Sequence, residues 1–475
     1  MGIRSRRAVA LVTVLFLLVA GGLLALYLTT SRREVTTSSA AAYEAYRAGV
    51  ENFRRFYRKE ARADFGRALS LDPNFAMAML RLANLSSSDQ YKSLVERAAR
   101  LRNRLNEREQ LWVDYYSLGE KGTREERLKL IRTIHEKYPN DVDAAQWISG
   151  DEMAQGRPEE AIRIMMDLLA RDPNNADVYN QCGYYYALRG EYEKGIENLK
   201  KYQFMAPDQA NPYDSLGEIQ AYTGHYDEAI ANLNKALSLK PDFYESHYHL
   251  GVAYEGKGEP ARAIEQYLQA AGDALTDGKR MDLYASTMRV AIHADDKAAV
   301  HDAARRVAQL PKQKETEHWM AFTDTAVDLV EGRLDAAEKR LGERRPKLLA
   351  EFEMNNRDRQ RKPYFPVWNA MMALTKARLG KTDEAIALLE ESINPPNAGD
   401  TAFEGRRAVY EAKAWLAALL AKKGDLDRAE KLLAENRAWN PSWAPTRPAE
   451  LTVAQARREK VLSAAGETGD RKSAH

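Results

Sequence analysis

The chain has 475 residues, of which 44% are hydrophobic and 29% charged, with a formal net charge of +2. This length exceeds what one compact core usually holds, so several domains or a repeat array are expected. The near-zero charge gives no global field that favours nucleic acid, and the single cysteine, Cys182, excludes an intrachain disulfide framework and any multi-cysteine metal site.

The N-terminus is unusually apolar. A basic segment, residues 1–7, precedes an uncharged run over residues 8–28. Its length of about 21 residues suits a helix that crosses a bilayer. A cleavable signal usually has a shorter apolar core and a small-residue exit site, whereas this run ends in Leu26-Tyr27-Leu28. The sequence therefore predicts one uncleaved transmembrane helix, with a cleaved signal as the alternative.

The flanking charges predict an orientation. Arg4, Arg6 and Arg7 precede the run, and Arg32 and Arg33 follow it. The positive-inside rule then places the N-terminus in the cytoplasm. For a bacterial source, the expected location is the cell inner membrane, with the body of the chain in the periplasm. Residues 29–41, rich in Ser, Thr and Ala, are expected to form a linker.

Beyond residue 41, apolar residues recur at helical spacing, and breaks follow a period of 34 residues. Four rows share this period: Pro139, Pro173, Pro207 and Pro241; Gly183, Gly217 and Gly251; Gly156, Gly190, Gly224 and Gly258; and Ala161, Gly195, Ala229 and Ala263.

Each row has a structural interpretation. The row of Gly217 marks a close approach of two helices, where a larger side chain does not fit. The row of Gly224 marks a turn after the first helix, a position that favours positive φ. The row of Ala229 packs on the second helix, and the row of Pro241 ends that helix. The rows together predict repeated helical hairpins.

The stretch Tyr179-x-x-Cys182-Gly183-x-x-Tyr186 and its 34-residue equivalents resemble the tetratricopeptide repeat (TPR) family. The resemblance implies an all-α TPR superhelix, an α-solenoid, of about nine or ten helix pairs behind the transmembrane helix. The array is expected over residues 42–443, with its best-formed repeats at 142–277. Residues 444–475 are expected to form a capping helix and a disordered tail.

The candidate catalytic and metal-binding motifs of the sequence each lack a required residue or spacing. Gly380-Lys381-Thr382 ends like a phosphate-binding loop, but Thr375 stands where the first glycine is required. His247 and His249 are two residues apart on a predicted helix, so they face different sides. Cys182 occupies a packing position, where a buried thiol acts as a small hydrophobe. No enzyme activity, cofactor or metal site is therefore predicted.

Charge is unevenly distributed along the array. Residues 139–277 carry a net charge of about −13, whereas residues 43–138 carry about +6. Two interpretations stay open: a solvated helical surface, or an acidic groove for a partner with basic segments. A second candidate surface, Arg357 to Trp368, interleaves basic and aromatic residues, although docking of its aromatic residues on the next helix explains the same pattern.

In TPR proteins the first helix of each pair lines the inner groove, and the resemblance carries that property onto particular residues here. Aromatic rings beside carboxylates make a plausible cradle for a peptide, with Tyr184, Tyr222 and Tyr248 as anchors. The clamp for a terminal carboxylate is absent. The predicted groove residues are Gln146, Asn180, Tyr184, Asp214, Glu218, Tyr222, Tyr248 and Glu255.

The predicted function is a membrane-anchored scaffold that binds a segment of a partner protein in the concave groove. The expected partners are a protein or peptide, basic in character, and the membrane through the N-terminal helix, with no nucleic acid and no small-molecule cofactor. Two alternatives use the same surface: a periplasmic chaperone-like assembly factor, or a sensor or regulatory subunit of a separate enzyme such as a kinase.

Overall fold

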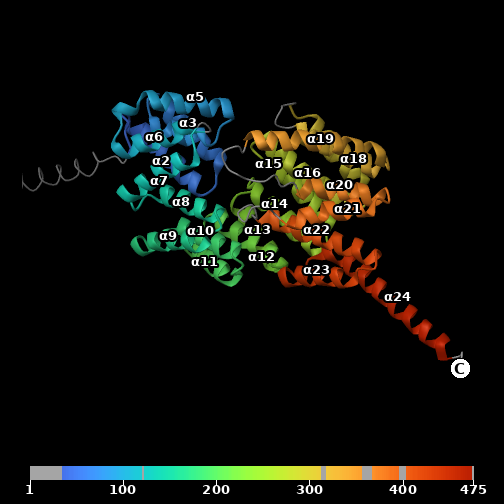
Figure 1. Cartoon of the computed structure of the whole chain (residues 1–475). Helices are drawn as coiled ribbons and strands as arrows, with labels where there is room; N and C mark the ends of the chain where they lie inside the picture. The colour runs from blue at the N-terminus through green and yellow to red at the C-terminus, as the bar shows by residue number, and fades with distance from the viewer. Residues whose placement is uncertain (1–34, 120–121, 312–316, 356–365, 395–402, 473–475) are drawn as a thin grey trace, which may run out of the picture. The chain divides into compact units, whose positions relative to one another are not determined.

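A computed structural model describes residues 35–119, 122–311, 317–355, 366–394 and 403–472 (Figure 1). These residues form α-helices and short 3-10 turns, and no strand occurs among them. The chain divides into two compact units, residues 1–122 and residues 123–475. The all-helical fold predicted from the sequence is confirmed for the described part of the chain.

Unit 1 packs its helices around aromatic residues. Tyr46 lies 4.9 Å from Phe75 and 5.8 Å from Phe65 between ring centroids. A Cβ atom on Gly49 would meet the Phe65 ring at 2.7 Å, so the first two helices touch closely. The elements are α2 (Ala40–Arg54), α3 (Arg58–Leu71), α4 (Ala76–Ala83), α5 (Ser88–Arg100), η1 (Arg102–Arg104) and α6 (Glu107–Leu118).

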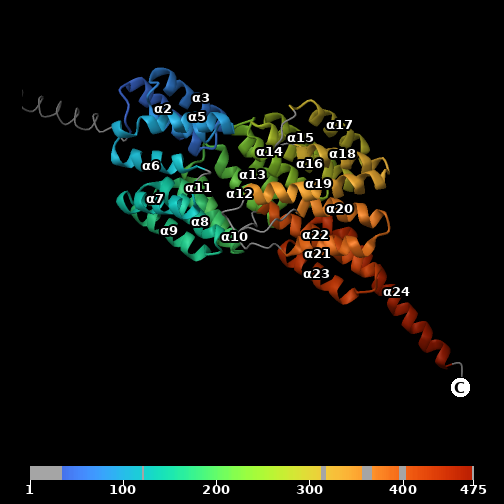
Figure 2. The ribbon, with the colours of Figure 1, turned by 45° about the horizontal axis from the view of Figure 1, so that its top comes forward.

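Unit 2 begins with α7 (Arg124–Lys137) and continues as helical hairpins, seen in both views (Figures 1 and 2). Its further elements are α8 (Val142–Ala154), α9 (Pro158–Arg171), α10 (Ala176–Leu188), α11 (Tyr192–Met205), α12 (Ala210–Tyr222), α13 (Tyr226–Leu239), α14 (Tyr244–Lys257), α15 (Pro260–Asp273), α16 (Asp277–His293), α17 (Lys297–Ala308), α18 (Glu317–Val330), α19 (Leu334–Asn355), α20 (Pro366–Arg378), α21 (Thr382–Ile393), α22 (Phe403–Lys422), α23 (Leu426–Trp439), η3 (Ala444–Thr446) and α24 (Arg447–Lys472).

Consecutive helices pack as pairs. Within the described ranges the pairs are α2–α3 and α4–α5 in unit 1, and α8–α9, α10–α11, α12–α13, α14–α15, α16–α17, α18–α19, α20–α21 and α22–α23 in unit 2. These ten pairs agree with the nine or ten expected from the period. We call the first member of each pair the inner helix and the second the outer helix.

The 34-residue rows have the structural causes inferred for them. A Cβ atom on Gly217 would meet Leu233 Cγ of the outer helix at 2.7 Å, so only glycine fits the contact. Gly224 has a φ of +86° at the turn between α12 and α13. Ala229 is fully buried. As at Gly217, a Cβ atom would clash at the two equivalent glycines: Gly183 lies against Leu199, and Gly251 lies against Tyr267.

The predicted inner-membrane location, with a cytoplasmic N-terminus and a periplasmic body, is contradicted. Among the helices of the described ranges, none is both long enough and apolar enough to cross a bilayer. The physical reason is visible in the longer ones: α22 carries Arg406, Arg407, Glu411 and Lys413 within its span. The run at residues 8–28, on which the prediction rested, lies outside the described residues.

Two other predictions concern the ends of the array. Helix α2 begins at Ala40, two residues earlier than the predicted array. Helix α24 projects from the rest of unit 2 and continues to Lys472, through part of the segment expected to be disordered (Figures 1 and 2). The basic and aromatic segment from Arg357 falls mostly on residues 356–365, outside the described ranges.

The C-terminal part of unit 2 returns onto its earlier helices. Asn440, directly after α23, donates hydrogen bonds to the backbone oxygen of Tyr222 (3.1 Å) and to the Tyr226 hydroxyl (3.0 Å). Trp439 and Trp443 belong to the same buried cluster as Tyr222 and Tyr248. Arg406 donates to the backbone oxygen of Leu188, at the end of α10. Segments more than 200 residues apart in sequence are therefore packed together.

Candidate functional site

All eight predicted groove residues lie on inner helices of unit 2. Helix α8 carries Gln146, helix α10 carries Asn180 and Tyr184, helix α12 carries Asp214, Glu218 and Tyr222, and helix α14 carries Tyr248 and Glu255. The structure divides them into three groups with different surroundings.

The first group, Gln146 and Asn180, makes few polar contacts. Gln146 is half-buried, and its backbone oxygen accepts a hydrogen bond from Ser149 (3.0 Å). Asn180 is 7% exposed, and its side-chain oxygen accepts no hydrogen bond from any residue that the structure describes. A buried acceptor without a donor is uncommon in folded proteins, so this amide is a point of interest on the inner face.

The second group is an acidic cluster around His249. The Tyr184 hydroxyl donates to Glu218 Oε2 (2.5 Å), and Ser246 donates to Asp214 Oδ1 (2.7 Å). His249 lies between the two carboxylates, with Nδ1 3.0 Å from Asp214 and Nε2 3.6 Å from Glu218. Burial raises the pKa of Tyr184 well above its usual value, and the two carboxylates raise it further, so the phenol stays a donor.

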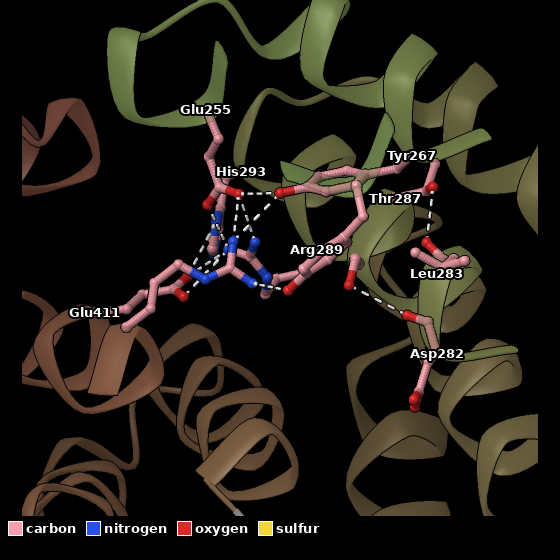
Figure 3. A network of polar contacts seen from close by, with 11 residues as sticks. Glu255, Tyr267, Asp282, Leu283, Thr287, Arg289, His293 and Glu411 are labelled. Atoms are coloured by element: carbon pink, nitrogen blue, oxygen red, sulfur yellow. Dashed lines mark hydrogen bonds and ion pairs between the residues drawn. The ribbon is translucent and has the colours of Figure 1, made fainter. Parts of the chain in front are cut away.

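The third group is a buried ionic cluster built on Glu255 of α14 (Figure 3). Arg289 of α16 donates to both carboxylate oxygens of Glu255, at 2.8 and 2.7 Å. Arg407 of α22 donates to Glu255 Oε2 (2.9 Å), as does the Tyr267 hydroxyl (2.9 Å). Arg407 also reaches the Tyr248 hydroxyl at 3.4 Å. Two residues predicted to face an open groove, Tyr248 and Glu255, are each 6% exposed as a result.

A second carboxylate balances the cluster. Glu411 of α22 accepts from Arg289 at 3.1 Å, and His293 Nδ1 lies 3.6 Å from it. Two guanidinium groups thus meet two carboxylates. Burial alone would raise the pKa of Glu255, but the charges of Arg289 and Arg407 outweigh it and hold that pKa well below its usual value.

His293 differs from Arg289 and Arg407 in its charge. A third of its side chain (32%) still meets solvent, and its ring packs edge-on against Trp415 at 4.8 Å. The surrounding protein limits its hydration and lowers its pKa, against the opposing effect of Glu411, while Arg289 lowers it further. His293 is therefore neutral near pH 7, and the cluster of two arginines and two glutamates carries no net charge.

Tyr222 and Cys182 are packing residues in this structure. Tyr222 is 1% exposed beneath the returning C-terminal segment. Cys182 is fully buried in α10, and burial raises the pKa of its thiol to about 12, as expected for a packing position. Within the described part of the chain, no group of three or more His, Cys, Asp or Glu side chains is arranged to hold a metal ion.

Sequence reasoning missed Arg289, Arg407 and Glu411. The first lies in a region, residues 276–314, that departs from the repeat pattern, so its face could not be assigned by register. One signal was present: Arg289 stands between Met288 and Val290 in an otherwise apolar stretch of helix, where an unpaired charge would be costly. That signal indicates a buried ion pair but does not identify its partner.

Comparison with known proteins agrees with the helix-pair geometry. A family model described as "Tetratricopeptide repeat" matches residues 151–211, and one described as "TPR repeat" matches residues 217–258. These two segments of the chain carry TPR repeats. The matched segments cover α9 to α14, the region in which the 34-residue rows are best preserved, and the other pairs continue the same packing.

Three solved structures match parts of the chain at low identity and with TM-scores below 0.5. A chain of the APC/C hetero-tetramer Cut9–Hcn1 is 16% identical, with a TM-score of 0.45 over 87% of this chain and 76% of that one. A tetratricopeptide repeat protein from Parabacteroides merdae is 10% identical (TM-score 0.37, 56% and 96%). MamA from Desulfovibrio magneticus RS-1 is 22% identical (TM-score 0.30, 35% and 93%). No curated protein sequence matches the chain.

The TPR repeats indicate a protein–protein interaction scaffold and a protein partner. TPR proteins are typically non-enzymatic, which agrees with the lack of a catalytic motif in the sequence, although the absence of catalysis stays a prediction. The identity of the groove residues stays a prediction as well.

Proposed function

We propose that this TPR protein is an interaction scaffold that binds a basic segment of a partner protein on the inner face formed by α8, α10 and α12. One observation carries the proposal. These three inner helices contain six carboxylates and neither Lys nor Arg. A surface of one sign attracts segments of the opposite sign and speeds their arrival. The carboxylates are Asp143, Asp151, Glu152, Asp177, Asp214 and Glu218.

Two of these carboxylates are neutralised by neighbouring arginines. Asp151 pairs with Arg124, and Glu152 pairs with Arg157. Asp143 and Asp177 stand 34 residues apart, so they occupy the same place in successive repeats. Both are partly exposed. Because they are partly exposed and equivalent in position, these two aspartates are the carboxylates at which we test the attraction of a basic partner.

The chain itself offers a precedent for the chemistry of the contact. On α14, Arg407 inserts between Glu255 and the hydroxyl groups of Tyr248 and Tyr267. An inner-helix carboxylate beside a tyrosine is thus a suitable receptor for a guanidinium group. On α10 and α12 the pair Tyr184 and Glu218 has the same composition, and it is the position at which we expect a partner arginine to bind.

The proposal covers less of the inner face than the eight sequence-predicted residues. Tyr222, Tyr248 and Glu255 pack against α22 and the segment after α23, so in this conformation they do not offer a surface to a partner. Gln146, Asn180, Tyr184, Asp214 and Glu218 are the predicted residues that remain in the proposed site.

The test uses the full chain and two synthetic peptides of equal length, one alternating Arg with apolar residues and one alternating Glu with the same residues. The double variant Asp143→Asn/Asp177→Asn is expected to bind the basic peptide about tenfold more weakly, because each lost charge pair contributes up to about 1 kcal/mol at a partly exposed site. Binding should also weaken as salt rises. Affinity is measured by fluorescence anisotropy of the labelled peptide.

The matched control is Glu193→Gln/Glu197→Gln on the outer helix α11, which removes the same charge from exposed positions. It should leave the affinity unchanged. If both double variants lose the same affinity for the basic peptide, binding depends on the net charge of the chain and not on the proposed site. Equal binding of the acidic and basic peptides would also refute the site.

A further inference from the structure

Unit 2 contains a cavity of about 170 Å³ on its inner side, next to the ionic cluster. Its walls come from α14, α16, α18, α20 and α22, the inner helices of five consecutive pairs. A cavity of about 150 Å³ in another protein is large enough to hold benzene. The space in this chain therefore has room for one six-membered ring with a small substituent, but not for a folded peptide segment.

Most of the cavity wall is apolar and aromatic. Trp319 and Phe322 of α18 meet edge to face, with ring centroids 5.9 Å apart, and Trp415 of α22 lines the cavity beside His293. Met371 and Leu374 of α20 are further apolar lining residues. Small-molecule sites typically combine such a wall with a few polar groups that fix orientation.

Two cations lie at the Tyr248 side of the cavity. The Lys279 ammonium lies 5.3 Å from the centre of the Tyr248 ring, and no carboxylate of the described residues lies within ion-pair distance of it. Arg407 uses Nη1 for Glu255 and Tyr267, while its Nη2 reaches, among the described residues, only the Tyr248 hydroxyl, at 3.4 Å. Both groups have donor capacity left for a ligand.

The other charged groups of the wall do not favour a cationic ligand. Arg289 is shared by Glu255 and Glu411, so the charge of Glu411 is already compensated. The Asp282 side chain points away from the Arg289 guanidinium (Figure 3). His293 is neutral near pH 7. The ionic cluster is neutral as a whole, so at the Tyr248 end of the cavity the wall offers a negatively charged ligand the Lys279 ammonium and the remaining donor capacity of Arg407.

We propose that this cavity binds a small organic monocarboxylate with a flat apolar body of about one ring. The ring packs between Trp319, Phe322 and Trp415. The carboxylate accepts hydrogen bonds from Lys279 Nζ and Arg407 Nη2. The site is separate from the peptide-binding surface proposed on α8, α10 and α12, and it stands whether or not that surface binds a partner.

The experiment titrates the full chain with three probes of similar size: benzoate, benzyl alcohol and benzylamine. Binding is measured by calorimetry and by the rise in melting temperature that a ligand of the folded state produces. Benzoate is expected to bind at least about tenfold more tightly than the neutral probe, since a charge-assisted hydrogen bond is worth that factor or more. Tighter binding of benzylamine, equal binding of all three, or binding of none would overturn the proposal.

Two variants locate the site. Lys279→Met keeps the aliphatic stem and should lose about tenfold in benzoate affinity with little change for benzyl alcohol. The control Lys297→Met removes an exposed lysine at the start of α17 and should change neither. Ala370→Leu places a larger side chain on the cavity wall and should abolish binding of every probe. Unchanged benzoate affinity in Lys279→Met would refute the proposed orientation.

Discussion

The helices α10 to α15 and the helices α16 to α23 are built from the same kind of hairpin but are held by different contacts. In α10 to α15, each pair is fixed locally, as where Gly217 lies against Leu233 with no room for a Cβ atom. Side chains of α16 to α23 also make polar contacts across long sequence separations: Arg289 binds Glu411 of α22, 122 residues away, and Arg407 binds Glu255 of α14, 152 residues away. The repeated sequence positions thus determine how each hairpin packs, whereas buried charges hold together helix pairs that are far apart in sequence.

The largest expected effect comes from breaking the long-range contacts. Glu255→Ala leaves Arg289 and Arg407 in the interior with one carboxylate, Glu411, between them. An uncompensated buried charge costs roughly 3–5 kcal/mol of stability. The free energy of unfolding is measured by urea denaturation followed by circular dichroism.

The control for that variant is Glu197→Ala, which removes an exposed carboxylate from α11 together with its pair to Lys201. An exposed ion pair contributes up to about 1 kcal/mol, so the expected loss is small. If both variants lose the same stability, the buried cluster does not hold the divergent helices, and the comparison between the two regions fails.

A medium effect is expected from the local contact. Gly217→Ala puts a Cβ atom 2.7 Å from Leu233 Cγ, and such overpacking typically costs 1–3 kcal/mol. Gly342 provides a matched substitution in the divergent region, since it lies inside α19 with open space where its Cβ would stand. Gly342→Ala should stabilise the chain by about 0.5–1 kcal/mol, because alanine restricts the unfolded chain. A lower melting temperature for Gly217→Ala and a higher one for Gly342→Ala would confirm that only the first glycine is a contact residue. Shifts of the same sign in both variants would contradict it.

The parts of the fold that could be predicted are those that repeat. The spacing of Pro139 and its equivalents identified the hairpins, and the row of Gly217 identified where helices touch, because both are local consequences of backbone geometry. The position of Gln146 and Asn180 on inner helices followed from the same register. Assignment to an inner helix does not determine exposure, however. Exposure depends on which distant segment covers the helix.

The closure of unit 2 was therefore not predictable. Nothing in the repeat pattern indicates that Arg407 reaches Tyr248, or that Asn440 reaches Tyr222, since these contacts depend on the sum of small rotations over several pairs. The apolar run at residues 8–28 illustrates a different limit. Its composition alone suggested a membrane location, which the helices of the described ranges contradict.

The smallest effect concerns pH and also separates the two regions. The pKa of His293 is lowered in the folded chain, so the folded state binds fewer protons than the unfolded state around that pKa. Its contribution to stability is therefore fully present above the unfolded value of about 6.5 and is lost as pH falls through the folded value. Because a third of the side chain meets solvent, the loss between pH 7.5 and pH 5.5 should stay below about 1 kcal/mol.

His293→Gln is expected to flatten the fall in stability between these two pH values, whereas His301→Gln should leave it unchanged. His301 pairs with Glu331 at an exposed site, away from the ionic cluster. The free energy of unfolding of the unchanged protein and of the two variants is measured by urea denaturation at both pH values. The contributions of the other histidines to the pH dependence then cancel in the comparison. If His293→Gln keeps the full pH dependence, the fall in stability does not arise from the protonation of His293. The contacts of α16 with α22 would then be insensitive to acid, like the glycine contacts of α10 to α15, and buried charge would distinguish the two regions in stability alone.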